Sequence, residues 1–230
     1  MSHERKAMSA DRRSFLERLA LGTVGLGAME SLRPASTPFD RLRPAADWDL
    51  SWTARVVGAR RAVYDIPEIE DGFGVWRAIL AKQQYVDVLK VAPGDISMVM
   101  VLRHNAISLA MNQVFWEKYN IGPDKKVKDP MTQQETRRNP VAERTGQWAL
   151  PAQYSAMALE PFMANGGIVL GCGLAFQECI GRVAGGDKVD AAEAEKRAKA
   201  MLVPGVILQP SGVFAAQLAQ DSGCRYVRAS

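Results

Sequence analysis

The feature that most constrains the fold is the run of residues 96–102 (ISMVMVL), which is apolar except for one serine. A strand with apolar side chains on both faces must be covered on both faces, as in the middle of a parallel sheet. The turn Pro93-Gly94-Asp95 comes directly before this run, and a polar stretch follows it. The run therefore predicts a buried strand with helices packed on either side.

Strand-like runs and helix-like stretches alternate along most of the chain. Further strands are expected at residues 62–66, 168–170, 206–208 and 225–227. Apolar spacing of three to four residues predicts helices at residues 75–90, 107–119, 152–164, 174–183, 191–201 and 213–220. Pro161 should end or bend one of these helices, and Gly185-Gly186 should form a turn. The alternation predicts an α/β fold, a single doubly wound, mostly parallel sheet of about five strands with helices on both faces.

Residues 120–147 interrupt this alternation with Gly, Pro, Asn and many charges. Such long loops in compact domains are usually functional or disordered. A chain of 230 residues fits one domain plus a leader. We therefore expect a domain at residues 48–230 with a loop insertion at about 120–150. Residues 29–47, which contain Pro and Ser and lack periodicity, are expected to form a flexible linker.

Residues 1–28 resemble a twin-arginine export signal. The pair Arg12-Arg13 is followed by one free position and then by Phe15-Leu16, and an apolar stretch with several glycines comes next. That stretch is about ten residues long, whereas a membrane span needs about twenty. A charged start and a short apolar middle are typical of a processed signal. The alternative is an amphipathic helix that contains an arginine pair.

This signal predicts passage through the twin-arginine translocase as a folded protein and a location in the bacterial periplasm. The mature form is then expected to have no stable membrane span. The periplasm is oxidising, so free thiols there can pair. One disulfide plus one free thiol among Cys172, Cys179 and Cys224 is an open alternative, as is the cleavage site of the signal.

Several classes of function lack their sequence marks. The net charge of +4 is modest, and no basic face interleaved with aromatic residues indicates nucleic-acid binding. The chain contains no G-x-x-x-x-G-K-[ST], no G-x-S-x-G and no H-E-x-x-H motif. Three cysteines without a C-x-x-C pair do not predict a zinc site. We expect neither a bound metal nor a cofactor.

Cys172 is the first candidate for chemistry. It lies between a predicted strand and a predicted helix, and Gly171 and Gly173 flank it. Backbone N–H groups and the helix dipole at such a place favour a thiolate, as a nucleophilic or persulfide-carrying cysteine requires. The alternative is a small buried thiol in a tight turn. Cys179, within an apolar helical run, is expected in the core, and Cys224 begins the last strand.

His104 is the second candidate, because it follows the run 96–102 where a strand leads into a helix. Ligands bind at the carboxyl ends of strands in open α/β sheets, and a histidine there can act as acid, base or ligand. Arg103 and Asn105, together with the glycines around Cys172, are the expected ligand-binding neighbours. The alternative is a packing or capping residue at a strand end.

Three stretches together resemble the DsrE/DsrF-like family. They are ISMVMVLRHNAISLAM, GGIVLGCGLAF and VPGVILQPSGVFAAQLAQDSGCRYVRA, and the resemblance covers about residues 60–230. In that family small α/β subunits assemble into trimers or hexamers, and some members carry sulfur as a cysteine persulfide. The resemblance implies a homo-oligomer, a persulfide role for Cys172, and His104 as its neighbour.

Three hypotheses about function follow. The first is an exported DsrE/DsrF-like protein that handles sulfane sulfur through the Cys172 thiolate. The second is a non-catalytic periplasmic ligand-binding or assembly protein with a pocket at His104, Asn105 and Cys172. The third, an oxidoreductase with a bound cofactor, is prompted only by the export route. Whether the chain is an enzyme, and which substrate or ligand it takes, are open at this point.

Overall fold

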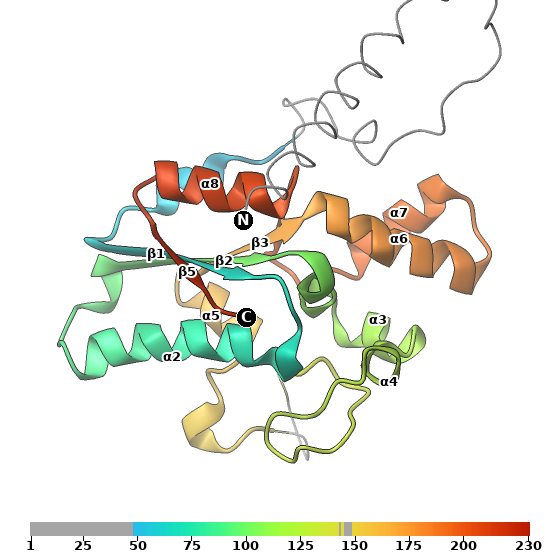
Figure 1. Ribbon diagram of the computed structural model, residues 1–230, viewed down its shortest axis with the longest axis horizontal. Helices are drawn as coiled ribbons and strands as arrows, with labels where there is room; N and C mark the ends of the chain where they lie inside the picture. The colour runs from blue at the N-terminus through green and yellow to red at the C-terminus, as the bar shows by residue number, and fades with distance from the viewer. Residues whose placement is uncertain (1–47, 143, 145–148) are drawn as a thin grey trace, which may run out of the picture. The chain divides into compact units, whose positions relative to one another are not determined.

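A computed structural model of the chain describes residues 48–142, 144 and 149–230 (Figure 1). The predicted export signal, with Arg12, Arg13, Phe15 and Leu16, lies outside these residues, and so does the predicted linker. One sheet of five parallel strands runs through the described part, in the order β4-β3-β2-β1-β5. The strands are β1 Arg60–Ile66, β2 Ile96–Leu102, β3 Ile168–Cys172, β4 Ile207–Gln209 and β5 Arg225–Arg228. The predicted α/β fold with one parallel sheet is confirmed.

Helices cover both faces of this sheet (Figure 1). Helices α2 (Phe73–Asp87) and α5 (Leu159–Ala164) pack on one face, and α8 (Gly212–Asp221) packs across all five strands on the other. The remaining helices are α3 Gln113–Lys118, α4 Ile121–Lys125, α6 Gly173–Asp187 and α7 Ala191–Ala200. Short 3₁₀ turns are η4 Ser51–Arg55, η5 Glu70–Gly72, η6 Pro93–Asp95, η7 His104–Ala110 and η9 Ala152–Tyr154. Because α8 leads from edge strand β4 to edge strand β5, the sheet is doubly wound.

Strand β2 is buried along its whole length, as its composition predicts. Its alternating side chains divide between two separate clusters, because successive residues of a strand point to opposite faces. Met98, Met100 and Leu102 belong to the cluster on the α2 side. Val99 and Val101 belong to the cluster on the α8 side. Neither face of β2 could be left uncovered without exposing these side chains to water.

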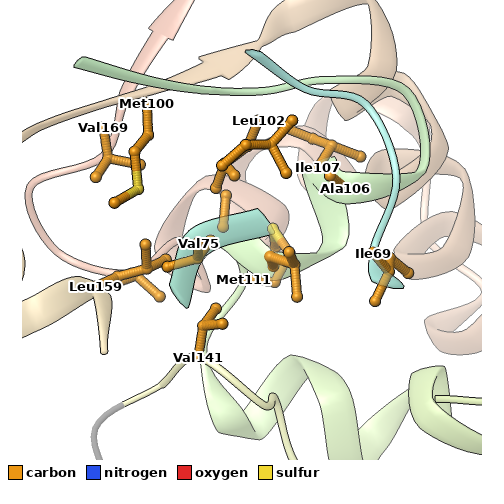
Figure 2. Packing of buried hydrophobic residues seen from close by; sticks show 14 of the residues in the cluster. Ile69, Val75, Met100, Leu102, Ala106, Ile107, Met111, Val141, Leu159 and Val169 are labelled. Carbon is orange, nitrogen blue, oxygen red and sulfur yellow. The ribbon is translucent and has the colours of Figure 1, made fainter. Parts of the chain in front are cut away.

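The larger cluster also includes part of the predicted loop insertion. Figure 2 shows Val141 beside Val75 of α2 and Leu159 of α5, below Met100 of β2. The buried Asn139 amide attaches this segment to the domain, because its Nδ2 donates to the carbonyls of Leu109 and Met111 at 2.9 and 2.7 Å. Residues 139–142 are thus an integral part of the core.

The predicted helix at residues 107–119 is wrong in its extent. The chain instead forms η7, then extended backbone at Met111, and then α3. Met111 forms an isolated bridge with Leu202, which takes its backbone out of the helix. Asn112 then caps α3 by accepting the Phe115 N–H at 3.1 Å. A tertiary contact that no local pattern contains overrides the helical spacing.

Two smaller predictions also need correction. Pro161 does not end a long helix, because α5 begins at Leu159 and a proline is tolerated in the first turn. Gly185 and Gly186 form no turn but lie inside α6. A Cβ at Gly186 would lie 2.8 Å from the ring of Tyr119, so this glycine lets Tyr119 pack closely against α6.

We predict that Leu102→Ala lowers the free energy of unfolding by about 2–5 kcal/mol, because it removes a fully buried side chain from the α2-side cluster. Urea unfolding followed by circular dichroism measures the change. The matched control is Leu89→Ala, whose side chain is 60% exposed. We expect the control to change stability by no more than about 0.5 kcal/mol. Equal effects of the two substitutions would contradict the central burial of β2.

Candidate functional site

The carboxyl ends of four neighbouring strands, β1 to β4, lie together at one border of the sheet, which we call the carboxyl edge. Most of the predicted site residues lie there. The parallel register places Leu102 of β2 opposite Gly171 of β3, and Cys172 opposite Gln209 of β4. Arg103, the next residue after β2, therefore lies beside Cys172. In open α/β sheets this edge is where ligands bind.

A row of polar side chains lies on the α8 side of this edge. Each member is two residues beyond an apolar residue of the α8-side cluster, so it points to the same face. We call this set the polar row, and its members are Asp65 of β1, Arg103 after β2, Cys172 of β3 and Gln209 of β4. A Cβ at Gly212 would lie 2.5 Å from the Cβ of Arg103, so the start of α8 packs closely over the row.

Asp65 and Arg103 form the strongest polar contact of the row. The Arg103 Nε and Nη2 donate to the two carboxylate oxygens of Asp65 at 2.7 and 2.8 Å, and the Tyr226 hydroxyl donates at 2.6 Å. The Asp65 residue is only 2% exposed. Burial by itself would raise the Asp65 pKa, but the hydrogen bonds from Arg103 and Tyr226 outweigh it and hold the pKa below its ordinary value. The same contacts raise the pKa of Arg103.

Cys172 is the N-cap of α6, as its predicted place between strand and helix required. Its Sγ accepts the Ala175 N–H at 3.4 Å, and the residue is 6% exposed. The hydrogen bond and charge of Asp65 raise the pKa of Arg103 most, and the nearby Cys172 sulfur adds the smallest contribution. The sulfur thus lies at a helix N-terminus and near a guanidinium.

The flanking glycines have packing roles in this structure. A Cβ at Gly173 would lie 2.8 Å from the Gln209 carbonyl oxygen and 3.0 Å from the Trp48 ring. A Cβ at Gly171 would lie 3.0 Å from Leu208. Both positions allow close approach of strand β4 or of the segment at Trp48. Their role in ligand binding stays a prediction.

All three cysteines are free thiols, so no disulfide joins them in this structure. Burial raises the pKa of Cys179 to about 12, and it raises the pKa of Cys224 to about 11. Both therefore stay protonated at neutral pH. Cys179 lies in the core as predicted.

His104 lies at the same edge but in a different environment from Cys172. Its backbone has a φ of +49°, and its side chain is 65% exposed. The His104 Nδ1 lies 3.0 Å from Glu68 Oε1, and Asn105 Nδ2 donates to Glu68 Oε2 at 2.8 Å. The hydrogen bond from Asn105, ahead of that from His104, lowers the pKa of Glu68. Within the described ranges no hydrogen bond connects His104 with Cys172.

Asn105 joins this pair to a wider set of charges. Its Oδ1 accepts a hydrogen bond from Lys125 Nζ at 3.3 Å. Lys125 in turn forms a 2.8 Å ion pair with Glu178 of α6, which also contacts Arg182 at 3.2 Å. Helix α4, inside the predicted loop insertion, is thereby attached to both η7 and α6.

Three residues of the edge escaped the prediction from sequence. Asp65 could have been found, because one acid at the end of an apolar strand must be paired when it is buried. Glu68 and Tyr226 carry no such signal. They lie 36 and 161 positions from their partners His104 and Asp65, so only the folded chain brings them together.

An open hollow of about 540 Å³ lies beside the polar row. Asp65, Arg103 and Tyr226 form one side of it, and α8 forms the other with Val213, Gln217 and Asp221. Polar groups of this kind orient small ligands in pockets. In the described part of the chain, no three His, Cys, Asp or Glu residues come together as ligands for a metal ion. None of the described helices is both long and apolar enough to cross a membrane.

The sequence matches no protein-family model and no curated protein. The chemistry of the carboxyl edge is therefore what points to a function.

We predict that Asp65→Asn lowers the free energy of unfolding at pH 7 by about 3 kcal/mol, because it leaves Arg103 without its charge partner. The pKa of Asp65 is lower in the folded state, so its stabilisation is complete above the ordinary pKa of about 4 and is lost as the pH falls through the folded value. Urea unfolding from neutral to acidic pH should show the difference between wild type and variant shrink below about pH 4.

The control for this prediction is Asp87→Asn, which neutralises an exposed carboxylate of α2. We expect this variant to follow the wild-type curve at every pH. If Asp65→Asn unfolds in parallel with wild type across the whole range, then the Asp65–Arg103 pair does not contribute as described.

Proposed function

We propose that this chain is a sulfur-handling protein of the DsrE/DsrF-like type, in which the Cys172 thiolate takes up and passes on sulfane sulfur. The observation that carries the proposal is the position of the Cys172 sulfur, which caps the N-terminus of α6 and interacts with Arg103. A helix N-terminus and a neighbouring guanidinium are the surroundings in which reactive cysteines occur in proteins. The other two thiols are held protonated by burial, so they do not compete.

The proposed step needs only a donor of the persulfide class. The Cys172 thiolate attacks the outer sulfur of R–S–SH, the S–S bond of the donor breaks, and R–S⁻ leaves with the electron pair. Cys172 then carries –S–SH, and attack by an acceptor thiolate on that outer sulfur regenerates the thiolate. No external oxidant or reductant is needed, because sulfur moves as a neutral atom between thiolates. Because Cys172 is 6% exposed, the donor must be small or the edge must open locally.

His104 has a supporting role in this proposal. Its exposed imidazole lies within hydrogen-bond distance of Glu68. His104 follows β2, and Cys172 ends the neighbouring strand β3. A histidine there can exchange a proton with an arriving donor or a leaving thiol. Asn105 holds the Glu68 carboxylate that orients the ring. We further propose that the protein acts in the periplasm after twin-arginine export and that it assembles as a homo-oligomer.

We predict that treatment of the full chain with polysulfide adds about 32 Da, one sulfur atom, to Cys172. Intact-mass spectrometry followed by peptide mapping measures the adduct and its position. Cys172→Ala should abolish it. Cys179 and Cys224 serve as internal controls within the same molecule and should stay unmodified, because their thiols remain protonated.

Either of two results would overturn the sulfur proposal. One is a folded protein that gains no mass at any cysteine. The other is an adduct that maps to Cys179 or Cys224 and persists in Cys172→Ala. Circular dichroism of each variant shows that the fold is intact before the mass is interpreted.

A second candidate is a non-catalytic ligand-binding protein, which is favoured by the burial of Cys172 together with the open hollow beside Arg103 and Tyr226. In this case a small polar ligand binds in the hollow against Arg103 and Tyr226, and Cys172 only packs the helix start. The ligand would stabilise the folded state in proportion to its occupancy.

For this candidate we predict that one member of a panel of small polar compounds raises Tm by several degrees, since a ligand at about a hundred times its Kd adds about 2.7 kcal/mol. Differential scanning fluorimetry measures the shift. Gln217→Ala, which alters only the exposed wall of the hollow, should reduce the shift. Cys172→Ala should retain it. An unchanged Tm across the panel would exclude this candidate.

A further inference from the structure

A second cavity lies at the opposite end of the sheet from Cys172. It has a volume of about 320 Å³ and lies at the amino-terminal ends of β1 and β2, beside edge strand β5. Three arginines and two tyrosines line it, Arg60, Arg61, Arg225, Tyr64 and Tyr85, and Ile96 and Met98 form an apolar floor. None of these residues takes part in the polar row or in the His104 contacts.

The cavity exists because the two helical layers are unequal. Helix α2 packs over β1 and β2, whereas the main helix contact of β5 is with α8 on the other face. The parallel register places Arg225 beside Ala62 and Val227 beside Tyr64, so these side chains point to the α2 side. All four residues of β5 are exposed. The space between edge strand β5 and Tyr85 of α2 is therefore part of the cavity.

The charge of this cavity is not balanced by acids. Among the described residues, none of the three arginines forms an ion pair. Arg60 and Arg225 point to the α2 side, whereas Arg61 alternates with Arg60 along β1 and donates to the carbonyls of Gly58 and Ser222 at 2.6 and 3.3 Å. Clustered cations without counter-charges attract anions, and the guanidinium fork matches the oxygens of a phosphate.

The walls favour a flat group next to that anion. Tyr64 is buried and Tyr85 is half-buried, and both border the cavity together with Met98. Burial, and then the neighbouring Tyr85, raises the pKa of Tyr64, so its hydroxyl stays neutral and can donate a hydrogen bond. Aromatic rings stack on flat ligand groups with favourable energy.

We propose that this cavity binds a small phosphorylated compound with a planar ring, of the size of a nucleoside monophosphate. The Arg60 and Arg225 guanidiniums share the α2 face of the sheet with Tyr64, and their two positive charges match a phosphate dianion better than a single carboxylate. The volume is at the lower end of the range for ligand sites and matches one ring with one phosphate. The proposal stands apart from the sulfur chemistry, because it uses the other end of the strands.

The test is isothermal titration calorimetry of the full chain with adenosine monophosphate. We expect saturable binding that weakens with added salt. Arg60→Ala and Arg225→Ala should each weaken binding by about tenfold, because each removes a charged hydrogen bond. The exposed Arg137→Ala, outside this cavity, should leave the affinity unchanged. Tyr85→Ala should weaken binding of the nucleotide but not of inorganic phosphate.

Several outcomes would overturn the proposal. Binding that is absent, or that is unaffected by Arg60→Ala and Arg225→Ala, removes the site. Benzoate that binds as tightly as the nucleotide removes the requirement for phosphate, and inorganic phosphate that binds as tightly removes the requirement for a ring. If sedimentation shows that the arginine substitutions break an oligomer and the nucleotide does not bind, a second copy of the chain occupies the cavity instead.

Discussion

The burial of β2 on both faces is the constraint on which the rest of this structure depends. Its side chains divide between a cluster under α2 and a cluster under α8, and water is excluded from both. A single layer of helices would leave Val99 and Val101 exposed. The chain meets this requirement by returning from β4 to β5 across the far face, with α8 on that connection. This connection places β4 and β5 at opposite sides of the sheet and α8 across its far face.

The same connection creates two chemically different ends of the sheet. At the carboxyl end the start of α8 closes over Arg103, beside Asp65 and Cys172, so charged groups are paired and partly shielded. At the amino end β5 is an exposed edge strand, and the described residues that line the cavity beside it include arginines but no acid. Electrostatic interactions are stronger where water is excluded, as around Arg103 and Cys172. An open basic cavity instead attracts anions from solution.

Much of the fold could be predicted from the sequence because its strongest signals are local. The buried strand at residues 96–102, the parallel sheet of five strands and the helices on both faces are all present in the structure. The failures occur where distant contacts override local preference. Met111 leaves a helical pattern to pair with Leu202. Asn139 attaches to the core a segment whose composition predicts only a long loop. Periodicity cannot report such contacts, because the partners are far apart in the chain.

The sequence by itself determined that Cys172 begins a helix at a strand end and that Arg103, His104 and Asn105 follow the central strand. Only the tertiary structure decided their partners. Strand register places Arg103 beside Cys172, whereas the exposed His104 contacts Glu68 and Asp65 takes the Arg103 guanidinium. The physical reason is that strand ends are set by local pattern, but the neighbour of each strand is set by the order in which the chain crosses the sheet. That order is a property of the whole fold.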